Sequence, residues 1–336
     1  MTQSTHTVTL GIAQAFYSLA IPNVSVSAVK LVKVLEFNPA GGERNFYWTE
    51  FHLKNICEAL SLKLVVITLD ELKCEKTVVE NRIYDVGILE RLNRKPGKNI
   101  VLAGQVEHIS VMRPSVYVGL NHSLLKRYEL IRKVFLPLRI RNFYSLSPKG
   151  KKGIFFREFA LSRKLMDDNR KKIVEFILAK NLPEYSFLAR LKALVHDGKC
   201  VVIVSLLAEH FGGRKEFNQV ILERAVNRAR GIGGILLIKN HPSDSHNHRP
   251  ILNSKGDVTV EVLSDAISRS FPMEILVSIF EKWEFFGTDS TFLPTSAHLA
   301  ASVPVVFEDT SRRSRSHFLY NVGESRKLYE CKEVFV

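Results

Sequence analysis

The sequence has few cysteines and no long uninterrupted apolar run. Its four cysteines, at positions 57, 74, 200 and 331, show no Cys-x-x-Cys spacing. This argues against a disulfide framework or a zinc site and favours a reducing compartment. The apolar stretch 10–29 is broken by Gln14, Pro22 and Asn23 and follows no basic start, so it predicts neither a membrane span nor a signal peptide. We therefore expect a cytoplasmic protein, either free or peripheral at the inner face of the membrane.

Acidic residues are also in short supply. There are 34 Asp and Glu against 48 Lys and Arg, which gives a formal charge of +14. Such a charge attracts anionic partners, among them nucleic acid, anionic lipid, nucleotide sugars and acidic glycans, although a merely basic soluble surface has the same composition. No basic patch interleaved with aromatic residues accompanies a recognised nucleic-acid motif. We therefore expect no nucleic-acid partner.

The length and patterning predict two α/β domains. A chain of 336 residues with 46% hydrophobic and 24% charged residues is folded and too long for one ordinary core. Short apolar runs alternate with segments of helical spacing, which indicates mostly parallel sheets. Strands are predicted at 8–12, 31–35, 63–68, 100–103, 116–118, 199–205, 234–238, 258–263, 283–286 and 303–307. Helices are predicted at 49–61, 163–179, 186–195, 216–230, 273–280 and 293–301.

Four segments bear on the domain boundaries and on alternative structures. A turn-forming, lysine-rich and glycine-rich stretch at 147–153 is the best linker candidate. It predicts an N-terminal Rossmann-like domain over 1–150, a helical bridging segment over 151–198 and a C-terminal Rossmann-like domain over 199–336. A helix over 25–35 competes with the strand 31–35, and 77–92 is amphipathic. The basic helical stretch 124–142 is either a solvated face or a contact for a polyanion or a membrane surface.

Two polar stretches directly follow apolar runs of the second domain. Residues 239–242 (Lys-Asn-His-Pro) come after the run 234–238, and residues 287–291 (Gly-Thr-Asp-Ser-Thr) come after 283–286. Residues just past the carboxyl ends of parallel strands line the ligand crevice of an α/β sheet. The first stretch offers an imidazole, and the second offers hydroxyls at the start of a helical pattern, where backbone N–H groups bind phosphate. Ordinary helix capping is the alternative for the second stretch.

The order of these stretches resembles a known family. Residues 237–242, then 270–276 (Ser-Phe-Pro-Met-Glu-Ile-Leu), then 286–291 resemble the His-Pro, Pro-x-Glu and Ser-Ser/Thr motifs of bacterial sialyltransferases and polysialyltransferases of capsule and lipooligosaccharide synthesis. The three elements fall within about 55 residues. The resemblance covers residues 199–310 and implies the GT-B fold, with two Rossmann-like domains whose mostly parallel sheets face a central cleft. It implies that the N-terminal domain binds the acceptor and the C-terminal domain binds the CMP-sugar.

The resemblance also implies site residues. His241 would stabilise or protonate the departing phosphate of a CMP-linked sugar, with Lys239 and Pro242 beside it. Gly287, Ser290 and Thr291 would complete the phosphate cradle, and Glu274 would accept hydrogen bonds from the CMP ribose. The alternative for Glu274 is a first-turn Glu that interacts with the helix dipole. The cradle requires no metal or other cofactor, and His246 and His248 lack further ligands at metal-binding spacing.

The sequence lacks the acidic motif that supplies the general base in the family it resembles. Family members carry an Asp/Glu-Asp/Glu-Gly motif after a strand of the N-terminal domain, whereas residues 116–123 have no carboxylate. His122 and Glu107 are the candidates that remain, with His122 favoured.

We therefore expect an inverting, metal-independent glycosyltransferase that moves sialic acid or a related nonulosonic acid from a CMP donor to an anionic glycan acceptor. The alternatives are transfer of another CMP-linked acid sugar such as Kdo, or a non-catalytic nucleotide-binding protein.

Overall fold

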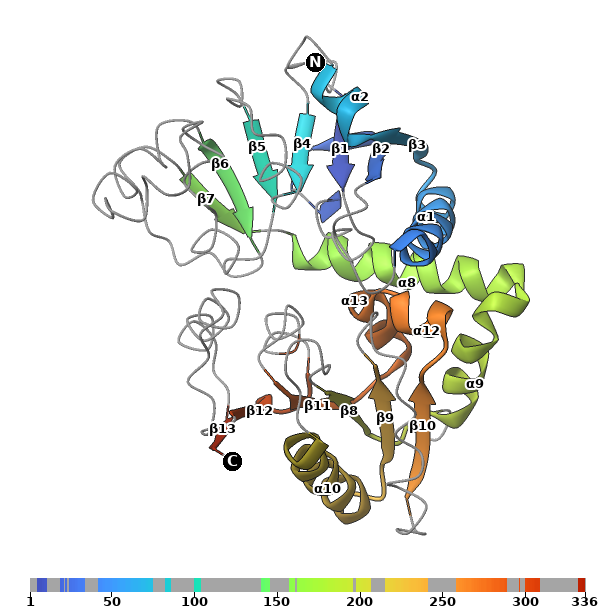
Figure 1. The fold of residues 1–336 in the computed structure, drawn as a ribbon, viewed down its shortest axis with the longest axis vertical. Helices are drawn as coiled ribbons and strands as arrows, with labels where there is room; N and C mark the ends of the chain where they lie inside the picture. Colours follow the sequence, from blue (N-terminus) through green and yellow to red (C-terminus); the bar gives the residue numbers. More distant parts are fainter. Residues whose placement is uncertain are drawn as a thin grey trace. The chain divides into compact units, whose positions relative to one another are not determined.

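The chain folds into two compact units, each with its own sheet (Figure 1). The computed structural model describes residues 5–10, 19–20, 22, 24–33, 42–74, 82–85, 100–103, 140–145, 157–160, 162–195, 198–206, 215–240, 258–288, 296, 300–308 and 332–335. Unit 1 comprises Met1–Phe37 and Thr49–Ile173, and unit 2 comprises Asn38–Trp48 and Val174–Val336. The finer division into segments 1–150, 151–198 and 199–336 stays a prediction.

Unit 1 is built on a seven-stranded sheet in the order β3-β2-β1-β4-β5-β6-β7. Every pairing between neighbouring strands is parallel. The strands are β1 (Thr5–Leu10), β2 (Ser25–Lys33), β3 (Lys63–Thr68), β4 (Arg82–Asp85), β5 (Ile100–Ala103), β6 (Ile140–Ser145) and β7 (Arg157–Ala160). The helices are α1 (Gly42–Ala59), α2 (Leu69–Cys74) and α8 (Arg163–Lys180), which also contributes residues to unit 2.

The structure settles several ambiguities of unit 1. Residues 25–33 form strand β2, so the helix predicted as an alternative over 25–35 is wrong. Strand β2 lies between β1 and β3, where Val29, Leu31 and Val32 are buried. The helix predicted over 124–142 is wrong at its end, because residues 140–142 belong to β6, which pairs with β5. Sheet pairing outweighs the helical spacing there, as it does for β-rich segments in general. The rest of that stretch, the strand 116–118 and the linker 147–153 lie outside the described residues.

Unit 2 has a six-stranded sheet in the order β10-β9-β8-β11-β12-β13, again with parallel pairings. Its strands are β8 (Val201–Ser205), β9 (Ile235–Lys239), β10 (Thr259–Leu263), β11 (Trp283–Gly287), β12 (Val305–Glu308) and β13 (Lys332–Phe335). Its helices are α9 (Ser186–Leu194), α10 (Lys215–Gly231), α12 (Ala266–Ser270) and α13 (Met273–Leu276), with 3-10 turns η4 (Pro183–Tyr185) and η6 (Val277–Ile279). The predicted unit of strand, helix and strand is confirmed as β8-α10-β9. The strand order is that of the Rossmann fold.

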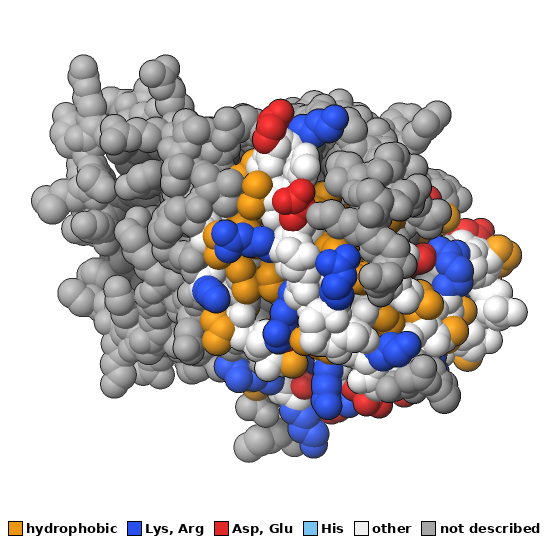
Figure 2. All heavy atoms as spheres, turned by 90° about the horizontal axis from the view of Figure 1, so that it is seen from below, with side chains coloured by type: hydrophobic (Ala, Val, Ile, Leu, Met, Phe, Trp, Pro, Cys, Tyr) orange, Lys and Arg blue, Asp and Glu red, His pale blue; other side chains and the backbone are white. Residues whose placement is uncertain are grey.

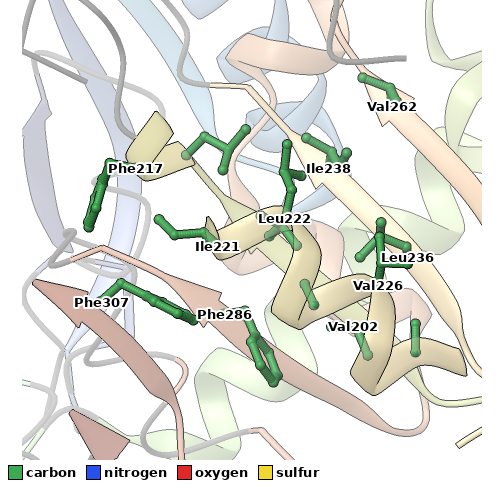
Figure 3. Packing of buried hydrophobic residues seen from close by; sticks show 14 of the residues in the cluster. Val202, Phe217, Ile221, Leu222, Val226, Leu236, Ile238, Val262, Phe286 and Phe307 are labelled. Carbon is green, nitrogen blue, oxygen red and sulfur yellow. The ribbon is translucent and has the colours of Figure 1, made fainter. Parts of the chain in front are cut away.

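The core of unit 2 explains why its strands have continuous apolar sequences. Side chains at alternate positions of the strands, such as Val202, Leu236 and Phe286, pack under the apolar face of α10 (Figure 3). The intervening positions, such as Ile203 and Phe285, are buried as well. A sheet buried on both faces is typical of parallel α/β folds. The predicted fold class, α/β with two Rossmann-like parallel sheets as in GT-B enzymes, is confirmed within each unit.

Two ion pairs fasten helices to this sheet. Arg228 on α10 donates two hydrogen bonds to Glu284 on β11, at 2.8 and 2.6 Å, and Arg190 on α9 donates to Glu261 on β10 at 2.9 Å. Both carboxylates are nearly buried, so each arginine supplies the partner that a buried charge requires.

The structure describes three of the four cysteines. Cys57, Cys74 and Cys200 carry free thiols, and burial raises the pKa of Cys57 to about 12. Within the described ranges, no helix is long and apolar enough to cross a membrane.

Candidate nucleotide-binding site

The strand order of unit 2 defines where a ligand is expected. From β8 the chain runs outward through β9 to β10 and then returns to the other side of β8 as β11. The crevice of such a sheet opens at the carboxyl ends of the two strands where the direction reverses, here β8 and β11. Ser205 and Gly287 are register partners at this point.

Gly287 is required by the close approach of these two strands. A Cβ atom on Gly287 would lie 2.9 Å from the carbonyl oxygen of Ser205 and 2.8 Å from Cζ of Phe285. Any side chain would therefore push the strand ends apart. Gly287 was expected in the phosphate cradle, and the structure places it at the carboxyl end of β11, opposite Ser205 of β8; contact with a nucleotide stays a prediction.

Lys239 is the last residue of β9 and is held inside the unit. It is 8% exposed, and its Nζ donates a hydrogen bond of 2.6 Å to the carbonyl of Arg269 in the last turn of α12. Asp265 caps the start of this helix by accepting from the backbone N–H groups of Ile267 and Ser268. Burial lowers the pKa of Lys239 to about 8; Glu274 opposes this shift and Arg269 adds to it.

Glu274 lies in the first turn of α13 and is 4% exposed. Its Oε2 atom is buried and accepts no hydrogen bond from the described residues. Burial raises the pKa of Glu274 to about 7, although its own backbone N–H and Lys239 both favour the charged form. A first-turn Glu that merely interacts with the helix dipole needs no such burial.

Lys239 and Glu274 thus form a buried, incompletely satisfied polar pair beside the carboxyl end of β9. Each charge favours the charged form of the other, yet the hydrogen bond of Lys239 goes to a backbone carbonyl. A buried carboxylate oxygen without a donor is unfavourable by about 1–3 kcal/mol or more. The pair offers a ligand a hydrogen-bond acceptor for hydroxyl groups and a positive charge nearby.

The remaining predicted site residues lie outside the described residues. His241 and Pro242 follow Asn240, a buried residue whose backbone N–H bonds to the Leu263 carbonyl at 3.4 Å. Residues 290 and 291 follow Thr288, which is also buried. The positions outside the description are His241, Pro242, Ser290, Thr291, His122 and Glu107. In the described part of the chain, no group of three His, Cys, Asp or Glu side chains could hold a metal ion.

Comparison with known proteins gives only distant likenesses to solved structures. No protein-family model and no curated protein matches the chain. A sialyltransferase from Photobacterium damsela is 12% identical, with a TM-score of 0.42 over 99% of this chain and 81% of that chain. MnaA of S. aureus in complex with UDP is 11% identical, with a TM-score of 0.41 over 96% of this chain and 87% of that chain. A glycosyl transferase of family 9 from Veillonella parvula is 11% identical, with a TM-score of 0.33 over 99% of this chain and 85% of that chain. Likenesses of this size carry no argument about activity.

The structure also points to a residue that the sequence analysis missed. In unit 1 the strand order reverses between β1 and β4, and Asp85 is the last residue of β4. Asp85 thus lies at the carboxyl edge of the sheet, beside β1. The residues after it are Val86 and Gly87. The signal was present in the sequence, but it lay in a segment assigned only as amphipathic.

The positive charge does not gather in one place on the face that Figure 2 shows. Lys and Arg side chains are spread over this face among hydrophobic, uncharged and some acidic side chains, as far as the described residues extend (Figure 2). A continuous basic stripe of the kind that follows a nucleic-acid backbone is not seen on this described face.

Proposed function

We propose that the chain is an inverting, metal-independent glycosyltransferase that moves sialic acid or a related nonulosonic acid from CMP to a hydroxyl of a glycan. The observation that carries the proposal is Glu274, a buried carboxylate beside the carboxyl end of β9 whose Oε2 accepts no hydrogen bond from the described residues. A ribose carries two neighbouring hydroxyls, which are the donors that this oxygen lacks. The motif order around His241, Glu274 and Gly287 supplies the choice of CMP as the nucleotide.

The reaction has a definite balance of bonds and protons. The acceptor oxygen bonds to the anomeric carbon of the donor sugar while the bond from that carbon to the phosphate oxygen breaks. CMP leaves with the electron pair, and the acceptor hydroxyl gives its proton to a base. His241 stabilises or protonates the departing phosphate, and Lys239, two residues earlier in the chain, adds positive potential.

For the base we place Asp85 first, before His122 and Glu107. A carboxylate accepts a proton from a hydroxyl, and Asp85 lies at the carboxyl end of a strand where the strand order of unit 1 reverses. Because the base acts only on the acceptor, its loss should leave donor binding unchanged.

The test is to measure CMP binding, donor hydrolysis and sugar transfer in parallel. His241→Ala should lower both hydrolysis and transfer by at least about 100-fold. Asp85→Asn should lower transfer by about 100-fold or more with CMP affinity unchanged. Asp70→Asn, which alters an exposed carboxylate of the same unit, is the matched control and should leave sugar transfer unchanged.

The same assay applied to His122→Ala and Glu107→Gln ranks the three candidate bases. Normal transfer by Asp85→Asn would remove Asp85 from the mechanism. A wild type that binds CMP but transfers to no acceptor would favour the non-catalytic alternative.

A further inference from the structure

A charged side chain interrupts the buried stripe of α8. Met166 and Ile173 are buried in this helix, and Arg170 lies between them at the spacing of one helix face. The Arg170 side chain is 11% exposed, although arginine seldom occupies such a position unless it is fully paired.

Arg170 is incompletely paired. Its Nη2 donates to Oδ1 of Asp167 at 2.6 Å, and its Nε is buried without a hydrogen-bond partner in the part of the chain that the structure describes. A guanidinium has five N–H donors, and Asp167 is itself 38% exposed. Burial lowers the pKa of Arg170 more than Asp167 raises it, so the positive charge is under-compensated. A buried donor left without an acceptor is unfavourable by about 1–3 kcal/mol.

The start of α8 lies at the carboxyl edge of the unit 1 sheet. The helix begins three residues after the last residue of β7, and all strands of this sheet are parallel. The backbone N–H of Ser162 donates to the carbonyl of Ala20 at 2.9 Å, in the connection that leaves the carboxyl end of β1. Asp85 ends β4 on this same edge.

A second polar atom of this unit lacks a partner. Thr9 is completely buried in β1, one residue before the strand ends, and its Oγ1 has no hydrogen-bond partner within the described ranges. Among the described residues of unit 1, Thr9 and Arg170 contribute the buried side-chain polar atoms without partners. Natural proteins keep few such groups, and those that persist are concentrated at functional sites.

We propose that Arg170 binds the carboxylate of an acidic sugar in the acceptor, and so selects anionic glycans over neutral ones. The inference rests on the proposed glycosyl transfer, in which unit 1 receives the acceptor. Its Nε, which has no partner among the described residues, and the neighbouring Nη2 lie on one edge of the planar guanidinium, and such an edge pairs with both oxygens of a carboxylate, which a neutral sugar does not carry.

The experiment measures acceptor binding in the absence of donor. A sialic acid trimer and the same trimer with its carboxylates converted to methyl amides are titrated into the full-length protein by calorimetry. The wild type should bind the acidic trimer at least about tenfold more tightly than the amide. In Arg170→Met this preference should fall to near unity, and in Arg170→Lys, which keeps the charge but loses the forked geometry, it should be intermediate.

Lys171→Gln is the matched control, because Lys171 is an exposed cation one residue further along α8. It should keep the wild-type preference. An equal loss in Lys171→Gln, or an unchanged preference in Arg170→Lys and Arg170→Met, would overturn the inference. If Arg170→Met fails to fold, the Arg170→Lys result alone decides, since an unchanged preference there contradicts the role of the fork.

Titration of CMP into the same preparations separates this inference from the proposed function. CMP binding together with an acidic preference that does not need Arg170 refutes only the role of Arg170. An acidic preference that needs Arg170, in a protein that binds no CMP, supports the role of Arg170 and refutes the donor assignment.

Discussion

Replacing Glu274 with Gln should stabilise the ligand-free protein at neutral and alkaline pH while weakening nucleotide binding. Burial raises the pKa of Glu274 from 4.5 to about 7. Between these two values the folded protein holds a proton that the unfolded chain has lost, so its stability falls as the pH rises through this window. Above pH 7 the wild type has lost the whole contribution, whereas Gln is neutral at every pH.

The magnitude follows from the size of the window. The difference between 4.5 and about 7 corresponds to about 3 kcal/mol of unfolding free energy. The attraction between the Glu274 carboxylate and the Lys239 ammonium group is already contained in this difference, because Lys239 lowers the pKa of Glu274. We therefore expect Glu274→Gln to be more stable than wild type by about 1–3 kcal/mol at pH 8 and equal to it near pH 4.5.

Unfolding in urea followed by tryptophan fluorescence is a suitable assay. Both tryptophans, Trp48 and Trp283, belong to unit 2, which also contains Glu274. Glu281→Gln is the control, because Glu281 is exposed in the same unit. CMP affinity should drop at least about tenfold in Glu274→Gln, since a charged acceptor is lost. The reasoning would be refuted if Glu274→Gln were less stable than wild type at pH 8. It would also be refuted if the unfolding free energy of the variant fell between pH 4.5 and about 7 as that of the wild type does.

Three further predictions follow from the same site. Gly287→Ala should destabilise unit 2 by about 1–3 kcal/mol because its Cβ meets the Ser205 carbonyl, while Gly231→Ala, with no atom within 4 Å of its Cβ, should be neutral in the same urea assay. Transfer should survive EDTA; a loss restored by Mg²⁺ or Mn²⁺ would contradict the metal-independent cradle. Ser290→Ala combined with Thr291→Ala should weaken CMP binding in calorimetry, and an unchanged affinity would indicate ordinary helix capping.

The buried strands of unit 2 could be predicted because their sequences are short, continuous apolar runs, which are typical of strands in a parallel sheet. The run before Lys239 is apolar at every position, and Ile235–Lys239 is buried throughout. The edge strands β7 and β13 were not anticipated. Each has four residues, and their stability comes from pairing with a neighbour rather than from a sequence pattern of their own.

The details of the candidate site depend on packing that sequence spacing does not encode. The hydrogen bond from Lys239 to Arg269 joins residues 30 positions apart, and it forms only because α12 ends beside β9. Glu274 and Arg170 both have the spacing of ordinary helix residues in the sequence. Only the structure shows that they are buried and that each has a polar atom without a hydrogen-bond partner among the described residues. Asp85 could be recognised as a candidate only from the strand order, because that order places the end of β4 beside β1.

The central claim, that unit 2 binds a CMP-linked donor, is tested most directly by titrating CMP, UMP and GMP into the wild-type protein by calorimetry. The account predicts that CMP binds at least about tenfold more tightly than either of the others, and that Glu274→Gln loses this binding. Equal or tighter binding of UMP or GMP, or no binding of any of the three, would contradict it.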